Sequence, residues 1–526
     1  MVDITFFGGV SEIGGNKILI EEADTKIFLD FGISFAKEAE YFEFPLLRPA
    51  CKEDLFKLKI LPKIKGIYNN QGLYAECCPD GEFKVKGERE EKNLDAIFLS
   101  HAHMDHYGYF GLLRTDIPIY MSELTKRFIL LREHTTKKSW NSSISHLDLK
   151  ILEKNQEISI GDLEIKRFNV DHSVLGASGY IIKSKDQTIA YTGDFRFHGH
   201  RGSLTEEFIS ELKNENIDIL ITEGTRVSKP KEEDEKEMEK RLLNTEEEVL
   251  NQCVDIISNE ENLIIYDASP ADLDRVRTLW KVAQATGRKL IIDSRKAYLL
   301  LFINAEKNLV DGLPQLDDFL IYLNRLKFRS SRVYNDLSGG IDVFAESYEF
   351  YRELHEAELT IKQQINSKHK KTKILDEYKD HYKNPNLFEI DDKYFLWGPP
   401  GREKVLSAPN EYIIYTSNGM QTLLQFKPEN RGLKGTYIYG KAEPFNEVMK
   451  LSFNKLKKWL KICDLGLEYA HTSGHISRER MESFLDETTP KKLIPIHTEN
   501  PKEFFDIGAG KAYEVIVPSY SKKIHF

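Results

Sequence analysis

Short apolar stretches separated by turn residues dominate the first 200 positions of the chain. They are "DITFFGG", "NKILIEE", "TKIFLDFG", "LDAIFLS", "IPIYMS", "EISIGDLEIKRFNV", "SGYIIKS" and "QTIAYTGD". Alternating or continuous apolar runs of this length, punctuated by Gly, Asn and Asp, predict β-strands. A helical pattern, "ELTKRFILLREHTTKK" at 123–138, interrupts them. We therefore expect sheets with helices packed on them, an α/β sandwich.

The middle of the chain follows a different pattern. Residues 229–258 open with charged positions and continue with apolar positions at helical spacing. The strand "NLIIYDA", the helix "PADLDRVRTLWKVAQATG" and the strand "RKLIIDS" follow, and this strand-helix-strand unit implies a second domain with a parallel sheet. Residues 345–385 are polar and helix-prone. We interpret their basic run "KHKK" at 368–371 as a solvated helix face, with contact to a phosphate backbone as the alternative.

From about residue 440 the chain returns to strand and helix patterns. The stretches are "KLSFNKLKKWLKICD", "GLEYAHTSGH", "SRERMESFLDET" and "KKLIPIHTE". Histidine motifs follow two strand-like stretches here, as they do in the first 200 residues. We therefore expect the two ends of the chain to form one domain, with the middle inserted between them.

The composition supports folded domains and no membrane span. The 526 residues are 40 % hydrophobic and 11 % aromatic, which is enough for two or more domains with apolar cores. The five cysteines form no CxxC pair and no even set, which favours a reducing compartment, and we interpret Cys77 and Cys78 as loop or core residues. The chain has neither a signal-peptide pattern nor roughly 18 uninterrupted apolar residues, so a cytoplasmic protein is expected.

The formal net charge of -10 limits how this chain could bind nucleic acid. An acidic protein does not adhere to nucleic acid over its whole surface, although a basic cleft inside an acidic exterior is compatible with this charge. Any polyanion must therefore be bound locally.

The stretch "LSHAHMDHYGYF" at 99–110 concentrates metal-binding side chains at the end of a predicted strand. In α/β sheets, ligand chemistry usually lies where a strand ends. His101 and His103 project the same way from an extended chain, whereas Asp105 and His106 turn in a second direction. One hexapeptide can thus serve two adjacent cations. Imidazole and carboxylate ligands without cysteine suit zinc, or manganese and related divalent ions.

Two further ligands follow downstream. A cation held by His101 and His103 alone would lack ligands, and "NVDHSVLGASGYII" places His172 after a predicted strand, while "IAYTGDFR" ends a strand at Asp194. A lone histidine after a strand is usually structural. After an HxHxDH motif, the ligand interpretation is favoured.

This ordered set resembles the four successive motifs of the metallo-β-lactamase fold: "FLDFG" with Asp30, "HAHMDH", His172, and "TGD" with Asp194. The resemblance implies an αβ/βα sandwich and a site with two metals. In that site, the implied ligands are His101, His103 and His172 for one metal, Asp105 and His106 for the other, and Asp194 as the bridge. Asp30 is implied to support the metal loops without being a ligand.

Three further positions resemble motifs A, B and C of the β-CASP nucleases, the group of ribonuclease J, the cleavage-and-polyadenylation endonuclease and the Artemis/SNM1 proteins. They are Glu223 in "ILITEGT", His475 in "HTSGH" and His497 in "IPIHTE". The opening "GGVSEIGGN" and the tail are most similar to ribonuclease J. The resemblance implies a metallo-β-lactamase domain formed by residues 1–205 and 441–526, the second part carrying an RNA-specificity segment, and an inserted β-CASP α/β domain at 206–440.

The resemblance also implies roles. His497 is expected to complete the shell of the second metal, and Asp194 is expected at the reacting centre between the two metals. His475 is the candidate general acid, or phosphate ligand, for the departing 3' oxygen, and Glu223 would hold its imidazole in the right tautomer and orientation.

Two small-residue segments are candidates for binding the substrate, because small residues let backbone N–H groups approach phosphate oxygens. One is "HTSG", with His471, Ser473 and Gly474. The other is "SNGM", which resembles a β-CASP binding loop, with Ser417, Asn418, Gly419 and Met420. Since Asn-Gly is foremost a turn signal, a simple turn is the alternative for the second segment.

The predicted function is hydrolysis of phosphodiester bonds in single-stranded RNA by a hydrolase with two Zn²⁺ (or Mn²⁺) ions. RNA-cutting members of the group tend to carry histidine at the third β-CASP position and DNA-repair members valine, so His497 favours RNA. The expected mode is 5'-to-3' exonucleolysis, with endonuclease activity as a second mode. The alternatives are a DNA nuclease of the Artemis/SNM1 kind, a non-catalytic scaffold that binds nucleic acid or protein, and, least favoured, a hydrolase of a small ester.

The chain departs from ribonuclease J at three points. It reads "HTE" with Thr498 where ribonuclease J usually reads "HGE", and we expect no C-terminal assembly domain after Phe526. The sequence therefore predicts no particular homo-oligomer. The segment 41–93 is longer than expected and would either line the entrance of the site or decorate the fold.

Overall fold

The computed structural model of the chain describes residues 1–43, 46–69, 91–135, 141–144, 146–228, 241–293, 312–323, 395–441 and 447–526, with a few single positions between 296 and 310. The interpretations of Cys77, Cys78 and the basic run at 368–371 lie outside these residues. So do the first part of the charged segment at 229–258 and the centre of the long segment at 41–93.

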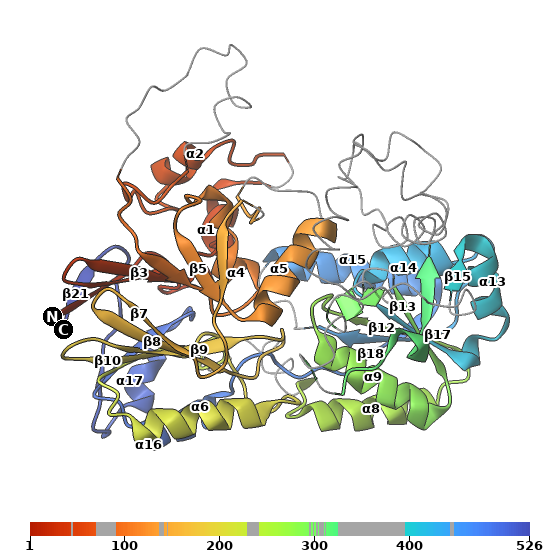
Figure 1. The fold of residues 1–526 in the computed structure, drawn as a ribbon. Coiled ribbons are helices and arrows are strands. Elements are labelled where there is room, and N and C mark those ends of the chain that lie inside the picture. The colour runs from red at the N-terminus through yellow and green to blue at the C-terminus, as the bar shows by residue number, and fades with distance from the viewer. Residues whose placement is uncertain are drawn as a thin grey trace, which may run out of the picture. The chain divides into compact units, whose positions relative to one another are not determined.

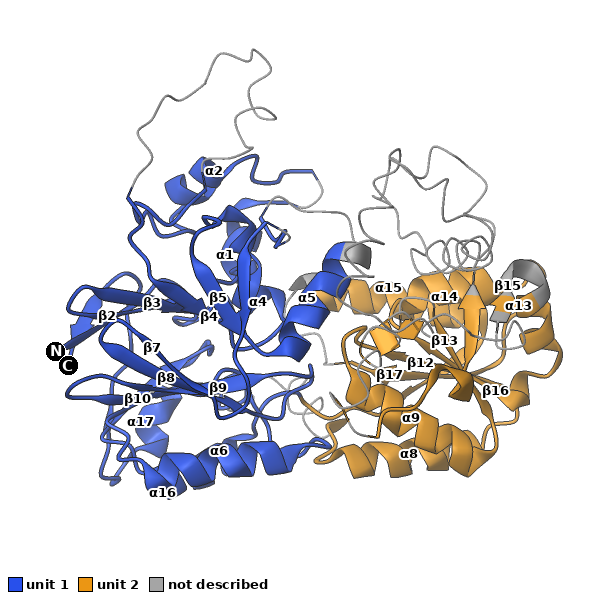
Figure 2. Cartoon of the chain, viewed as in Figure 1, with its two compact units in different colours: residues 1–133, 138–235, 474–526 blue, residues 134–137, 236–473 orange. Residues whose placement is uncertain are grey.

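The chain divides into two compact units (Figure 2). The first consists of residues 1–133, 138–235 and 474–526, and the second of residues 134–137 and 236–473. The chain passes from the first unit to the second after residue 235 and returns after residue 473, whereas the sequence pattern placed the boundaries after 205 and after 440. The reason is sheet membership, because β11 (Ile219–Glu223) pairs within the first unit, and β18 (Leu465–Tyr469) pairs within the second.

Two seven-stranded sheets form the centre of the first unit. One has the order β21 (Lys523–His525), β1 (Val2–Phe6), β2 (Ile18–Glu22), β3 (Thr25–Leu29), β4 (Ala96–Phe98), β5 (Pro118–Met121) and β6 (Asp148–Ile151). The other has the order β20 (Glu514–Val515), β19 (Lys492–Ile496), β11, β10 (Thr188–Tyr191), β9 (Ser178–Lys183), β8 (Leu163–Asn169) and β7 (Glu157–Ile160). Both sheets contain strands from the two ends of the chain.

The apolar sides of the two sheets face each other. Ile20 and Ile27 from one sheet and Ile182 and Ile219 from the other belong to a single fully buried cluster. Inner strands of the two sheets are buried on both faces, β4 and β11 at every position, so the opposite faces of the sheets are covered by helices. Figure 1 shows α5 (Glu123–Thr135) with α2 (Lys52–Lys57) and α4 (Met104–Tyr107) on one side, and α6 (Gly202–Asn214), α16 (Arg478–Thr488) and α17 (Glu503–Ile507) on the other. The predicted αβ/βα sandwich is confirmed.

The remaining described elements of this unit are short. The helix α1 (Phe35–Tyr41) has no buried residue, and η1 (Phe110–Leu112) is a fully buried 3₁₀ turn beside the metal-motif segment.

The second unit is built on a parallel sheet, as the strand-helix-strand pattern predicts. Its order is β15 (Phe395–Trp397), β14 (Leu320–Leu323), β13 (Lys289–Asp293), β16 (Tyr412–Thr416), β12 (Leu263–Ala268), β17 (Gly435–Gly440) and β18, and every neighbouring pair is parallel. In Figure 1, α8 (Glu246–Ser258) and α9 (Leu273–Thr286) cover one face. The helices α13 (Gly398–Ser407), α14 (Gly419–Phe426) and α15 (Glu447–Cys463) cover the other, and η2 (Leu316–Asp318) and η6 (Pro409–Glu411) precede β14 and β16.

No helix in the described ranges is both long enough and apolar enough to span a bilayer.

Candidate metal centre

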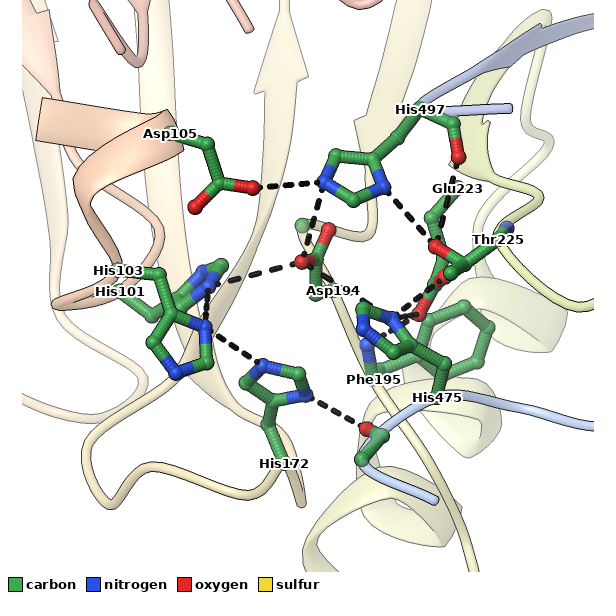
Figure 3. A network of polar contacts seen from close by, with 12 residues as sticks. His101, His103, Asp105, His172, Asp194, Phe195, Glu223, Thr225, His475 and His497 are labelled. Atoms are coloured by element: carbon green, nitrogen blue, oxygen red, sulfur yellow. Dashed lines mark hydrogen bonds and ion pairs between the residues drawn. The ribbon is translucent and has the colours of Figure 1, made fainter. Parts of the chain in front are cut away.

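The predicted metal-binding residues of the first unit all follow the end of a strand. His101 comes shortly after β4, His172 after β8, Asp194 after β10 and His497 directly after β19. The strands fix the backbone while the loops aim the side chains, so residues nearly 400 positions apart meet at one edge of the sandwich (Figure 3).

The first cluster combines three imidazoles and one carboxylate. The Nδ1 atom of His103 lies 2.9 Å from Nε2 of His101 and 3.2 Å from Nε2 of His172. The Oδ2 atom of Asp194 lies 3.6 Å from Nε2 of His101. In a tetrahedral zinc site with bonds of 2.0–2.1 Å, neighbouring ligand atoms are about 3.3 Å apart. These separations therefore match the edges of such a site.

The second cluster shares Asp194 with the first. Its Oδ2 atom lies 3.2 Å from Nε2 of His106 and 3.5 Å from Nε2 of His497. The Oδ2 atom of Asp105 lies 3.2 Å from Nε2 of His497 and 3.8 Å from Nε2 of His106. One carboxylate oxygen thus faces both groups, which is the position a bridging ligand requires.

Two buried atoms in this cluster have no hydrogen-bond partner within the described part of the chain. They are Nε2 of His106 and Oδ1 of Asp194. Buried polar atoms without partners are costly, and a cation supplies what both atoms lack. The residues present therefore fit two adjacent divalent ions, with no thiol among them.

In four of the candidate ligand histidines, the Nδ1 atom of the ring has a hydrogen-bonding partner. The Nδ1 atoms of His101, His106, His172 and His497 lie 3.0 Å from Ser100 Oγ, 2.7 Å from Asp30 Oδ2, 2.6 Å from the Gly474 carbonyl and 2.9 Å from Thr225 Oγ1, respectively. Such contacts fix the tautomer and the ring orientation of a metal ligand. The ligand set is therefore held in place by the protein itself.

Asp30 connects several of these contacts, in line with the support expected of it. Its carboxylate accepts from the Ser100 amide at 2.7 Å, from the Ser100 hydroxyl at 2.8 Å and from the Tyr191 hydroxyl at 2.5 Å. The Tyr191 oxygen in turn accepts from Asn16 Nδ2 at 3.2 Å. Fully buried and with φ at 57°, Asp30 holds an unusual backbone conformation that aims its carboxylate at His106.

The glycine-rich segment 8–16 wraps around the second cluster. The Asn16 amide donates to the Asp105 carbonyl at 3.0 Å, and the His497 amide donates to the Gly9 carbonyl at 2.8 Å. A Cβ on Gly14, which has a φ of +82°, would lie 2.6 Å from Asp105 Oδ2. The segment therefore links two ligands of the second cluster and needs glycine to approach Asp105.

Burial and charge set the protonation of the ligands in ways that favour a cation. Burial lowers the pKa of His103 to about 4 and holds those of His101 and His172 well below their usual value, so these imidazoles are neutral and able to bind metal. Burial opposes protonation of His106 as well, yet the carboxylates of Asp194, Asp105 and Asp30 raise its pKa well above the usual value. Without a metal, a proton on His106 offsets these negative charges, and a cation would take its place.

His475 and Glu223 form a pair beside the clusters. The Nδ1 atom of His475 lies 2.9 Å from Oε2 of Glu223 and 3.9 Å from Oδ2 of Asp194. Burial lowers the pKa of His475, but the Glu223 carboxylate outweighs it and raises that pKa to about 8. Glu223 also accepts from the amide of Phe195, which fixes the carboxylate. The imidazole therefore carries a proton near neutral pH and presents its Nε2 atom away from Glu223.

The substrate-binding candidates are divided between the units. Gly474 lies in the first unit against His172, whereas His471 and Ser473 lie at the end of the second. Four candidates follow β16 in the second unit: Ser417, Asn418, Gly419 and Met420. The Ser417 hydroxyl donates to Asp293 at 3.0 Å, the Asn418 side chain caps α14, and the Asn418 amide donates to the Thr416 hydroxyl at 3.0 Å, so these polar groups already have partners within the second unit.

Thr498 is buried and its hydroxyl accepts from the Asn500 amide at 3.3 Å.

Three residues that contact the candidate ligands or Asp30 were not predicted from the sequence: Ser100, Tyr191 and Thr225. The position of Thr225, two residues after Glu223, was the available signal, whereas Tyr191 has the pattern of an ordinary core residue of a strand.

The contact between His172 and Gly474 yields a prediction. A Cβ on Gly474 would lie 2.9 Å from Ser173 Oγ, 3.0 Å from Ser173 Cβ and 3.3 Å from His172 Cε1. Gly474→Ala will therefore displace the His172 ring and weaken binding of one zinc ion about tenfold, as loss of an orienting partner does. Competition with a chromophoric chelator measures this affinity.

Ser173→Gly in the same chain will restore most of the lost affinity, because it removes two of the three close contacts. Gly466→Ala is the matched control, since the nearest atoms to its Cβ lie at 3.8 Å. An unchanged zinc affinity in Gly474→Ala would show that this carbonyl does not position His172.

The sandwich and its His/Asp clusters define a protein of the metallo-β-lactamase fold with residues suited to binding metal. Family comparison agrees, because residues 76–250 match the β-lactamase superfamily domain. Among characterised proteins, the chain is similar to ribonuclease J proteins. It is 25 % identical over 335 residues to ribonuclease J 2 of Streptococcus pyogenes, covering 62 % of this chain and 50 % of that protein. It is 31 % identical over 235 residues to ribonuclease J of Helicobacter pylori, covering 43 % and 28 %.

The chain thus spans half or less of the length of these relatives. A solved structure extends the likeness of fold to nearly the whole chain. It is a protein of unknown function from Enterococcus faecalis, 20 % identical, with a TM-score of 0.68 and coverage of 99 % of both chains.

Proposed function

We propose that this chain is a ribonuclease that uses two divalent metal ions to hydrolyse phosphodiester bonds of single-stranded RNA, from the 5' end toward the 3' end. The observation that carries the proposal is the meeting of two ligand clusters on Asp194 beside a protonated imidazole supported by Glu223. Two-metal sites of this kind suit in-line displacement at phosphorus.

When bound, the two cations would lower the pKa of a water molecule and neutralise charge on phosphate oxygens. The chain's own residues supply the other requirements. Asp194 holds the two clusters together, and Asp30 and Thr225 keep the ligand rings from turning. His475 carries the proton that a departing 3' oxygen needs, and Glu223 accepts from Nδ1, which leaves the proton on Nε2 for transfer.

The ligand set supports zinc as the metal, with manganese as the second choice. Three imidazoles and a carboxylate at the separations described form a typical zinc environment, and no soft thiolate is present among the ligands.

RNA is supported by the named activity of the similar proteins, which are ribonucleases J, and by histidine at position 497. The 5'-to-3' direction is part of the resemblance to ribonuclease J. Binding of the strand is assigned to the backbone amides of Ser473 and Gly474 and of the segment 417–420.

The test is incubation of the full chain, loaded with Zn²⁺ or Mn²⁺, with 5'-monophosphorylated RNA and DNA of matched sequence, each labelled at one end. Release of mononucleotides from the 5' end of RNA alone is the expected result. Equal or faster cutting of DNA would contradict the RNA assignment. Binding of RNA without any cutting would instead point to a non-catalytic scaffold.

A further inference from the structure

The exposed side of α15 carries several lysines within the described positions 449–463. Between Val448 and Cys463 the sequence holds five lysines and neither Asp nor Glu. All five are exposed, and we call them the lysine face: Lys450, Lys455, Lys457, Lys458 and Lys461.

The opposite side of α15 explains why these lysines stay in solvent. Leu456, Leu460 and Cys463 are buried in the core of the second unit. With 3.6 residues per turn, Lys455 and Lys458 then lie on the line of the helix farthest from the sheet. Leu451 and Ile462 lie on the same line and are 59 % and 61 % exposed.

The lysine face differs from several basic side chains that are paired with carboxylates. Lys213, Lys491 and Lys511 each form an ion pair of 2.6 Å with a carboxylate. Within the residues that the structure describes, Lys455, Lys457, Lys458 and Lys461 form none, and Lys457 only packs on the Phe453 ring at 4.7 Å. A local excess of positive charge on a chain with a net charge of -10 therefore remains unneutralised.

Helix electrostatics account for only one of these lysines. A cation in the last turn of a helix interacts favourably with the C-terminal end of the helix dipole, and the effect fades within one turn. Only Lys461 lies in that turn. Lys455, Lys457 and Lys458 need a different reason, because like charges this close together on a helix repel each other unless an anion lies between them.

We propose that the lysine face of α15 binds the phosphate backbone of single-stranded RNA. The proposal rests on the proposed function, since it takes RNA as the substrate, and it adds a binding surface on the second unit, formed by residues other than the candidate metal ligands. Lysines three and four residues apart have Cβ atoms about 5–6 Å apart along a helix of about 25 Å, so they form a row of point charges suited to a linear polyanion. Leu451 and Ile462 give the bases apolar contact on the same line.

The test compares two fourfold variants of the full chain that lose the same charge. The first is K455Q/K457Q/K458Q/K461Q. The control is K63Q/K65Q/K185Q/K522Q, whose four lysines are exposed and lie in the first unit. Binding of a fluorescein-labelled 30-nucleotide RNA is followed by anisotropy over a range of KCl concentrations, with chelator present to prevent cutting.

The α15 variant is expected to bind at least about tenfold more weakly than the control. Its plot of log affinity against log salt should be shallower by roughly 2 to 3, because each released phosphate counterion contributes about 0.7 for a single strand. Replacing the four α15 lysines with arginine should keep both the affinity and the salt dependence, which shows that charge and not helix stability is measured.

Equal binding by the α15 variant and the control would overturn the proposal. So would equal weakening of both, because net charge alone would then explain the result. If RNA binding fails this test while the metal-loaded wild type still cuts RNA, the proposed function stands without the lysine face. A wild type that neither binds nor cuts RNA removes the proposed function itself.

Discussion

Asp194→Asn will leave the chain unable to retain two metal ions and will slow RNA cleavage by at least ~10³-fold, which corresponds to about 4 kcal/mol. The amide has the shape of the carboxylate but lacks its charge. In the wild type, Oδ2 lies 3.6 Å from His101 Nε2, 3.2 Å from His106 Nε2 and 3.5 Å from His497 Nε2, so its loss affects both clusters. Elemental analysis of the desalted protein and the initial rate on 5'-labelled RNA measure the two effects.

Two further variants separate the clusters. His103→Ala touches only the first cluster and Asp105→Asn only the second, so each should lose one ion rather than two. Asp186→Asn, at an exposed carboxylate of the same unit, is the control and should keep both ions. Two retained ions in Asp194→Asn would show that Asp194 is not a shared ligand.

His475→Ala will slow cleavage of ordinary RNA by about 10²- to 10⁴-fold, the usual contribution of a general acid. An RNA with sulfur in place of the departing 3' oxygen will be cut by the variant nearly as fast as by the wild type. Thiolate leaves without protonation, so this substrate does not need the proton of His475. Rates on the two substrates, measured at saturating RNA, make the comparison.

Glu223→Gln tests the partner of that acid. The acid works when protonated, and Glu223 raises the pKa of His475 to about 8, so the rate should fall as the pH rises through this region. Without the carboxylate the fall should begin at lower pH.

The contrary outcome for His475 is equally clear. If His475→Ala cuts the sulfur-containing RNA as slowly as it cuts ordinary RNA, His475 binds phosphate and transfers no proton.

Much of the fold is visible in the sequence because its strands have simple patterns. Alternating or continuous apolar runs identify β1 to β5 and β7 to β10, and apart from β7, whose apolar side chains are only partly buried, each of these strands has buried residues. The strand β6 was not predicted, because its residues Asp148–Ile151 are only partly buried and lack an apolar run. The limits of the two units could not be derived from the sequence, since the pairing of β11 with β19 joins residues more than 270 positions apart and leaves no local signal.

The candidate ligands were predictable for a related reason. Each belongs to a short motif at a strand end, so residue type and position coincide in one window of sequence. Ser100, Tyr191 and Thr225 orient those ligands through contacts across the fold, and a serine, a core tyrosine and a threonine have many ordinary uses. Only coordinates connect Tyr191 with Asp30, 161 positions away.

The position of His497, directly after β19, has a consequence for the order of events during synthesis. In the sequence, the second unit interrupts the first, and β11 has only β10 as a neighbour in its sheet until β19, residues 492–496, has left the ribosome. A growing chain therefore carries the HxHxDH motif, His172 and Asp194 long before it can close the second cluster. The nascent protein can acquire at most part of its metal site, and the cutting activity proposed for it begins only when the last strands have docked.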